Sequence, residues 1–153
     1  MSSARGAGRP ALVDQSPNII GRSAFDRLRE GRASRYALPG HVFSRIHVDD
    51  LARGLAASIA RPRAGGIYNF CDDEPAANSR VIAHAAKLLG VDPPPERPVD
   101  LEAMAPQARR FYAETKRVSN ALAKAELGWR PAYPTWREGL GAMLTPTPER
   151  SAA

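Results

Sequence analysis

Four side chains that can bind an anion or transfer a proton fall within six residues of this sequence. They are Arg45, His47, Asp49 and Asp50. A guanidinium group suits a phosphate or a carboxylate because its N–H groups form a planar fork, and an imidazole can hydrogen-bond to the same ligand. The alternative is structural, with Arg45 or His47 bonded to Asp49 or Asp50. The spacing alone leaves both interpretations open.

Metal and thiol chemistry have weaker sequence support. His41, His47 and Asp49 are ligand-type residues, but they lack a fourth ligand and the spacing typical of zinc sites, so we predict no metal site. The single cysteine, Cys71, can form no internal disulfide. Because it lies in an apolar run, we interpret it as a buried structural thiol.

The segment that carries the anion-binding candidates alternates like a β-strand over residues 42–48. Its aliphatic residues fall on one face, and Phe43, Arg45 and His47 fall on the other. A helix is predicted to follow at once, capped by the Asp49 carboxylate, and to stop before Pro62. Its predicted apolar face consists of Leu51, Ala52, Leu55, Ala56 and Ile59.

The same strand–helix order recurs further along the chain. Ile67–Cys71 is predicted to be a second strand, and the helix after it is expected to begin at Asn78 or Ser79 and to end at Gly90. Its apolar face would hold Val81, Ile82, Ala85, Leu88 and Leu89. A short helix from Ser23 to Gly31, with Phe25 and Leu28 as its apolar contacts, precedes both units. This alternation of strands and helices is typical of parallel βα units in an α/β protein.

The last third of the chain is predicted to be mainly helical. Residues 92–98 are rich in proline and should form a stiff, extended spacer. Three helical pieces follow: one opened by Pro106 and carrying Phe111, one from about Ser119 to Leu127, and one capped by Thr135 that holds Leu140 and Met143. We expect one domain at residues 18–144, with disordered tails at 1–17 and 145–153.

Composition bounds the remaining classes of function. The 153 residues are 43% hydrophobic and 25% charged, as in an ordinary globular domain. No apolar run has the length of a membrane span, and no signal peptide is recognisable, so we expect a cytoplasmic protein without a membrane partner. The net charge of +6 invites a nucleic-acid interpretation. We do not favour it, because the basic residues are scattered and acidic residues interrupt them.

Five segments, taken together, resemble the NAD-dependent epimerase/dehydratase family, the extended or atypical short-chain dehydrogenases. The family pattern includes a His-Val-Asp-Asp signature, which is present at residues 47–50. The five segments, in the expected order, are Gly21–Leu28, Phe43–Asp50, Gly66–Phe70, Lys116–Asn120 and Glu126–Pro131 with Trp136–Leu140. The resemblance implies a partial doubly wound (Rossmann-like) fold, namely the C-terminal substrate-domain portion, with few parallel strands and several helices.

The family binds NAD or NADP and transfers a hydride at a sugar-like carbon, through a Gly-rich turn and a Tyr-x-x-x-Lys pair that precede the His-Val-Asp-Asp segment. Residues 6–11 fit a loose Gly-x-Gly-x-x-Ala pattern, but too few residues precede them for a strand and Pro10 interrupts the turn. Tyr112 and Lys116 have the catalytic spacing and would share a helix face, yet they follow the signature. We therefore expect no catalytic residue, no cofactor-binding residue, and no dinucleotide bound by this chain alone.

The same resemblance places Arg22, Arg45 and His47 near the substrate cleft, which makes them the substrate-binding candidates. Our leading hypothesis is the C-terminal, substrate-side part of an NAD(P)-dependent epimerase/dehydratase-like oxidoreductase, specifically a nucleoside-diphosphate-sugar epimerase-like protein, not catalytic alone. The alternative is a non-enzymatic binding or regulatory module, and a basic nucleic-acid binder ranks third. The expected partners are a nucleotide-sugar substrate and either a second copy or a separate cofactor-domain protein.

Overall fold

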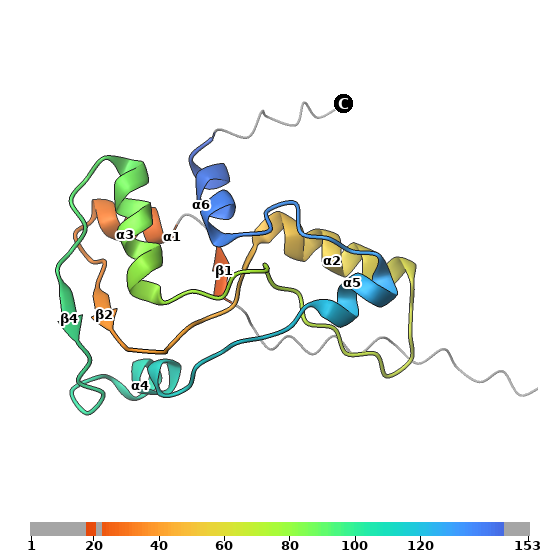
Figure 1. The fold of residues 1–153 in the computed structure, drawn as a ribbon, viewed down its shortest axis with the longest axis horizontal. Coiled ribbons are helices and arrows are strands. Elements are labelled where there is room, and N and C mark those ends of the chain that lie inside the picture. Colours follow the sequence, from red (N-terminus) through yellow and green to blue (C-terminus); the bar gives the residue numbers. More distant parts are fainter. Residues whose placement is uncertain (1–17, 21–22, 146–153) are drawn as a thin grey trace, which may run out of the picture.

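The computed structural model describes residues 18–20 and 23–145 (Figure 1). Two short parallel sheets lie within them. In the first, β1 (Asn18–Ile20) pairs with β3 (Arg45–His47), and in the second, β2 (Arg35–Ala37) pairs with β4 (Glu96–Pro98). Six helices surround the sheets: α1 (Ser23–Arg29), α2 (Val48–Ala60), α3 (Asn78–Leu89), α4 (Pro106–Ala113), α5 (Ala121–Leu127) and α6 (Trp136–Leu144).

The core consists of two clusters of buried side chains. In Figure 1, α1 and α3 lie on one side of β1 and α6, while α2 and α5 lie on the other. The first cluster joins the α1 and α3 side to α6 through Ile20, Phe25, Ala76, Val81, Ala85, Trp136 and Leu140. The second, beside α2 and α5, contains Ile46, Tyr68, Phe70, Ala123, Leu127 and Trp129. The parallel α/β class predicted from the sequence is confirmed.

The predicted strand at Ile67–Cys71 is wrong, because this segment pairs with no neighbouring strand. Only the next residue makes a backbone bond to β3, with Asp72 N donating to Arg45 O at 2.6 Å. The alternation that suggested a strand does survive as alternating burial: Tyr68 and Phe70 are buried, whereas Ile67 is exposed. The alternation of side chains therefore predicted correctly which residues face the core. It is not sufficient for a strand, because a strand also needs backbone hydrogen bonds to a neighbouring strand.

The transition from β3 to α2 occurs earlier than the sequence suggested. The predicted strand over 42–48 is reduced to Arg45–His47, and Val48 already belongs to α2. The predicted Asp49 cap is also wrong: His47 is the N-cap, and its Nδ1 accepts a hydrogen bond from Asp49 N at 3.2 Å. An imidazole nitrogen can satisfy an unpaired N–H of the first turn as a carboxylate does.

Helix α2 turns a different face to the core from the one predicted. Its buried residues are Asp50, Gly54 and Ser58. The Asp50 carboxylate accepts hydrogen bonds from Ala132 N at 2.7 Å and Tyr133 N at 2.9 Å, which satisfies the buried charge. Gly54 lies against the Phe70 ring so closely that a Cβ would come within 2.5 Å of it.

An apolar stripe on α2, formed by Val48, Ala52, Leu55 and Ile59, is left partly or fully exposed. Val48 is 46% exposed and Ile59 72% exposed. The four residues are spaced at four, three and four positions, so they share one helix face. Only Leu51 of the predicted apolar face packs against the second core cluster.

The remaining helix predictions are mostly confirmed. Phe25 of α1 is buried, and α3 ends at Gly90 in the left-handed conformation. Pro106 opens α4, α5 ends at Gly128, and Thr135 forms a capping box with Glu138 at the start of α6. Two details are wrong. The N-cap of α3 is Ala77 without a side-chain bond, and the proline-rich spacer contains β4 rather than an unpaired segment.

No helix within residues 23–145 is long and apolar enough to cross a membrane. The predicted tails were 1–17 and 145–153. All their residues except Thr145, the C-cap of α6, lie outside the described residues, as does the Gly-x-Gly-x-x-Ala pattern.

Candidate functional site

A cavity of about 530 Å³ opens between α1, α3 and α4. Ile20 of β1 and Leu140 of α6 close one side of it, Tyr36 of β2 lines another, and Arg45 of β3 lies in its wall. Two arginines, Arg45 and Arg27, line the cavity, and no aspartate or glutamate of the described residues does. The wall is therefore positively charged, which favours an anionic ligand.

Arg45 is the charged group most deeply placed in this cavity, with 4% of its surface exposed. Its Nη1 donates to two backbone oxygens, Phe43 O at 3.0 Å and Ala76 O at 2.7 Å. Its Nη2 is buried and has no hydrogen-bond partner among the described residues. A buried donor without a partner is costly.

The Arg45 guanidinium remains charged at neutral pH. Burial lowers its pKa to about 10, and the negative charge of Asp72 and the Tyr112 hydroxyl partly oppose that shift. No ion pair joins Arg45 to a carboxylate of residues 18–20 or 23–145. A buried charge is costly unless an opposite charge lies near it. Asp72 supplies part of that charge, and an anion in the cavity would add to it.

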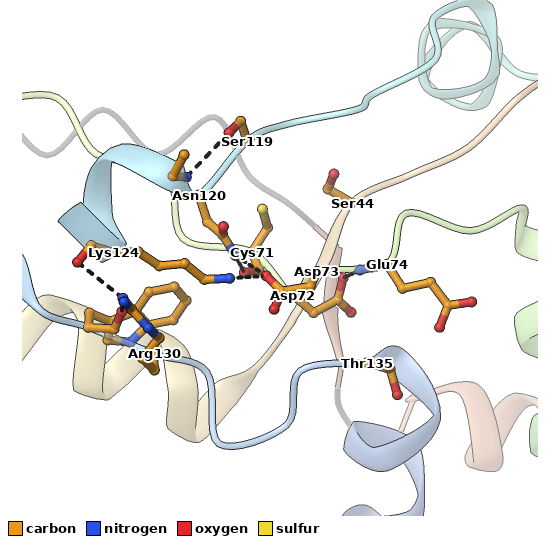
Figure 2. Close-up of polar contacts among 12 residues, drawn as sticks. Ser44, Cys71, Asp72, Asp73, Glu74, Ser119, Asn120, Lys124, Arg130 and Thr135 are labelled. Atoms are coloured by element: carbon orange, nitrogen blue, oxygen red, sulfur yellow. Dashed lines mark hydrogen bonds and ion pairs between the residues drawn. The ribbon is translucent and has the colours of Figure 1, made fainter.

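Asp72, whose charge interacts with that of Arg45, lies in a cluster of polar groups that Figure 2 shows in close-up. Burial raises the pKa of Asp72 to about 7, while a hydrogen bond from Glu74 N and the Arg45 charge oppose the rise. Its Oδ1 accepts from Glu74 N at 3.2 Å, and its Oδ2 is buried without a partner among the described residues. When Asp72 is protonated, it does not offset the Arg45 charge.

The neighbouring carboxylate, Asp73, is held by structural contacts. Its Oδ1 accepts from Asn120 Nδ2 at 2.7 Å and from Lys124 Nζ at 2.5 Å (Figure 2). Asn120 Nδ2 also donates to Cys71 O at 2.7 Å. The Cys71 thiol is buried, as predicted, and burial raises its pKa to about 12, so it is not a thiolate nucleophile.

Of the other two binding candidates, the structure describes only His47, which does not line the cavity. His47 is buried, caps α2, packs on the Tyr133 ring at 4.1 Å and does not line the cavity. Burial lowers its pKa against the opposing charges of Asp49 and Asp50, so the neutral ring acts as a cap. These contacts favour the structural interpretation of His47. Arg22 lies outside the described residues.

Tyr112 and Lys116 do not form a catalytic pair on one helix. Helix α4 ends at Ala113, so Lys116 lies beyond it, where its backbone bonds to Val42 O and accepts from Ser44 N. Tyr112 is half-buried and lines the cavity, a position that the sequence did not suggest. Burial raises the pKa of its hydroxyl, which therefore stays protonated at neutral pH.

The described residues do not fit a dinucleotide or a metal ion. A pyrophosphate binds at a glycine-rich strand-to-helix turn, where free N–H groups and the helix dipole meet it. The turn from β3 to α2 contains no glycine and places Asp49 and Asp50 in the first helical turn, where they would repel a phosphate. No group of three His, Cys, Asp or Glu side chains within the described ranges could hold a metal ion.

Comparison of the sequence with known proteins identifies a curated relative. The 3-diazoavenalumate denitrifying reductase of a Streptomyces species is 36% identical over 105 residues, which are 65% of this chain and 33% of that protein. The chain therefore spans about a third of this relative's length. No protein-family model matches the sequence.

Solved structures match a larger share of the chain. A conserved protein of unknown function from Silicibacter pomeroyi DSS is 49% identical, with a TM-score of 0.77, over 83% of this chain and 46% of its own. The human epimerase family protein SDR39U1, solved with NADPH, is 19% identical, with a TM-score of 0.70, over 86% of this chain and 47% of its own.

The fold shared with these structures is a partial Rossmann-like α/β fold. The structural neighbours are members of the NAD-dependent epimerase/dehydratase family, which also include a dTDP-glucose 4,6-dehydratase solved with NAD and a UDP-glucose 4-epimerase solved with UDP-glucose. The chain thus has the fold of one part of this family, as the sequence motifs predicted, and covers less than half of each of these structures.

Proposed function

We propose that this chain is the C-terminal, substrate-side part of an NAD(P)-dependent oxidoreductase of the epimerase/dehydratase type. The cavity binds the substrate, and Arg45 binds its anionic group. The observation that supports this most strongly is Arg45, a buried cation in the cavity wall that makes no ion pair with a carboxylate of the described residues. A bound anion would supply a negative charge beside it.

The chain does not catalyse hydride transfer alone in this proposal. Several neighbours were solved with NADPH or NAD, and the chain matches less than half of each. The acidic turn from β3 to α2 supports the same interpretation, because it is unsuited to a pyrophosphate. A separate cofactor-domain protein or a second copy of the chain would be the partner.

Calorimetry of the purified full chain with NADH and NADPH tests the cofactor part of the proposal. We expect no measurable heat of binding at dinucleotide concentrations up to about 1 mM. The Kd would then exceed about 1 mM, which corresponds to a binding free energy weaker than about −4 kcal/mol. A micromolar dissociation constant for either dinucleotide would show that the chain carries its own cofactor site and would overturn this part.

Thermal unfolding with anionic ligands tests the role of Arg45. A ligand present at about 100 times its Kd should stabilise the fold by about 2.7 kcal/mol and raise Tm by about 5–10 °C. UDP-glucose and 3-phenylpropanoate are suitable probes. The rise should vanish in Arg45→Lys and persist in Arg80→Lys, an exposed arginine outside the cavity. If neither anion raises Tm, the cavity is not a substrate site of this kind.

A second candidate function is the reduction of a substrate that is not a nucleotide sugar. The relative with 36% identity is a reductase of 3-diazoavenalumate, whereas the sugar-nucleotide enzymes with the same fold are at most 23% identical. The nucleotide-sugar proposal and this one differ only in the ligand of the cavity, so the two probes above separate them.

A further inference from the structure

Three aromatic side chains form one wall of the cavity. Tyr36, Phe111 and Tyr112, called here the aromatic wall, all line the cavity and are all half-buried. The Tyr36 and Tyr112 rings meet edge to face, with centroids 5.3 Å apart, and Phe111 and Tyr112 meet in the same way at 5.0 Å. Part of each ring surface is therefore left for contact with a ligand.

The aromatic wall and the anion-binding group are fixed by the same residue. The buried Phe43 ring stacks on Phe111 at 4.4 Å, and Phe43 O accepts a hydrogen bond from Arg45 Nη1. The Phe43 backbone is in turn bonded to Ala76 in both directions, at 3.1 and 3.0 Å. The relative position of the rings and the guanidinium is thus set before any ligand binds, which lowers the entropic cost of binding.

The rest of the cavity combines apolar and polar side chains. Val81, Ile82, Met104 and Leu140 provide apolar surface, and Ser23, Ser34 and Asn78 are polar. No carboxylate of the described residues lines the cavity. The charged acceptors that often hold sugar hydroxyls are therefore absent from the described lining, whereas an aromatic ring finds apolar surface there.

We propose that the cavity binds a small aromatic carboxylate, with its ring against the aromatic wall and its carboxylate toward Arg45. This inference rests on the proposed function of the same cavity and specifies its substrate class. An aromatic ring gains both apolar burial and edge-to-face contacts with Tyr36, Phe111 and Tyr112. The carboxylate is attracted by the charge of Arg45, which makes no ion pair with a carboxylate of the described residues.

Calorimetry of the full chain with three probes tests the proposal. We expect 3-phenylpropanoate to bind at least about tenfold more tightly than its uncharged amide and at least about tenfold more tightly than UDP-glucose. The amide isolates the role of the carboxylate without any mutation. This comparison therefore remains decisive even if an Arg45 variant fails to fold.

Tyr36→Leu tests the aromatic wall, because it keeps an apolar side chain but removes the ring. We expect a loss of about three- to tenfold in 3-phenylpropanoate affinity. Tyr133→Leu is the control, because Tyr133 packs on His47 outside the cavity. The affinity of this variant for 3-phenylpropanoate should match that of the wild type.

The outcomes separate the two proposals. If UDP-glucose binds more tightly than 3-phenylpropanoate and depends on Arg45, the aromatic-acid proposal is overturned and the proposed function stands. If the acid and its amide bind equally, Arg45 is not the anchor and both fail. Absence of binding by every probe also overturns both.

Discussion

At the scale of single residues, the unusual group is Asp72. It is 3% exposed, makes no ion pair and lies near Arg45. Its carboxyl pKa is raised from 3.8 to about 7 by burial. A folded-state pKa above the unfolded value means that the folded chain holds the proton more tightly, so the contribution to stability is present below about pH 4 and is lost as the pH rises through about 7.

Asp72→Asn should therefore remove a stability penalty above neutral pH. An amide keeps the acceptor for Glu74 N and cannot ionise. We expect the variant to be more stable than the wild type at pH 8 by a few kcal/mol, at about 1.4 kcal/mol per pKa unit. Urea unfolding between pH 4 and 8 measures this difference. The matched control is Asp26→Asn, an exposed carboxylate on α1. Equal pH profiles for Asp72→Asn and the wild type would contradict the prediction.

The sequence predicted part of the site at this scale. Arg45 was recognisable because a guanidinium beside His47 and two aspartates is a plausible anion-binding group. Its partners were not recognisable, because Phe43 O and Ala76 O are backbone atoms brought together only by the fold. The buried Asp72 could have been suspected, since it directly follows an apolar run, and Tyr36 had no local signal at all.

At the scale of secondary-structure elements, the contact of α2 with the 67–71 segment depends on one glycine. A Cβ at Gly54 would lie 2.5 Å from the Phe70 ring, and that ring also packs edge-on against Trp129 at 5.2 Å. The ring has little room to move, because Phe70 and Trp129 are both buried. The glycine is therefore required for packing, although glycine lowers helix propensity.

Gly54→Ala should destabilise the protein. Overpacking against Phe70 costs about 1–3 kcal/mol, which exceeds the gain of about 1 kcal/mol in helix propensity. Gly141→Ala is the control, because it lies inside α6 and its Cβ would meet nothing within 4 Å. We expect this change to stabilise the chain by about 0.5–1 kcal/mol. Denaturant titrations of both variants give the comparison, and equal effects of the two changes would refute the packing argument.

Helices were easier to predict than strands in this chain. Local signals define their ends, as with Pro106, Gly128 and the Thr135 capping box. The strands have only three residues each, and each exists because a distant segment pairs with it, as β4 does with β2. The prediction of which face of α2 is buried was also wrong. Asp50 is buried because it accepts hydrogen bonds from Ala132 N and Tyr133 N, and no local sequence pattern predicts these contacts.

At the scale of the whole molecule, the exposed apolar stripe of α2 predicts self-association. Val48, Leu55 and Ile59 present apolar surface on one face of a helix of 13 residues, and such surfaces commonly form interfaces. We expect a concentration-dependent dimer in sedimentation. Ile59→Lys should shift it to monomer, whereas Ile67→Lys, at an isoleucine outside α2 that is also exposed, should not.

A monomer at all concentrations would contradict this prediction. A strictly monomeric chain with a cooperative thermal transition well above about 65 °C would show that the stripe needs no cover.

The first core cluster also fixes when this chain can fold during synthesis. It joins Ile20 and Phe25 to Trp136 and Leu140, so it closes only after α6 has been made. At about 5–20 residues per second, translation takes roughly 6–23 s to travel from β1 to α6. During that interval Phe25 and Val81 can be covered only by the contact between α1 and α3, because Trp136 and Leu140 have not yet been made. The side of this cluster that α6 covers is therefore the last part of it to close.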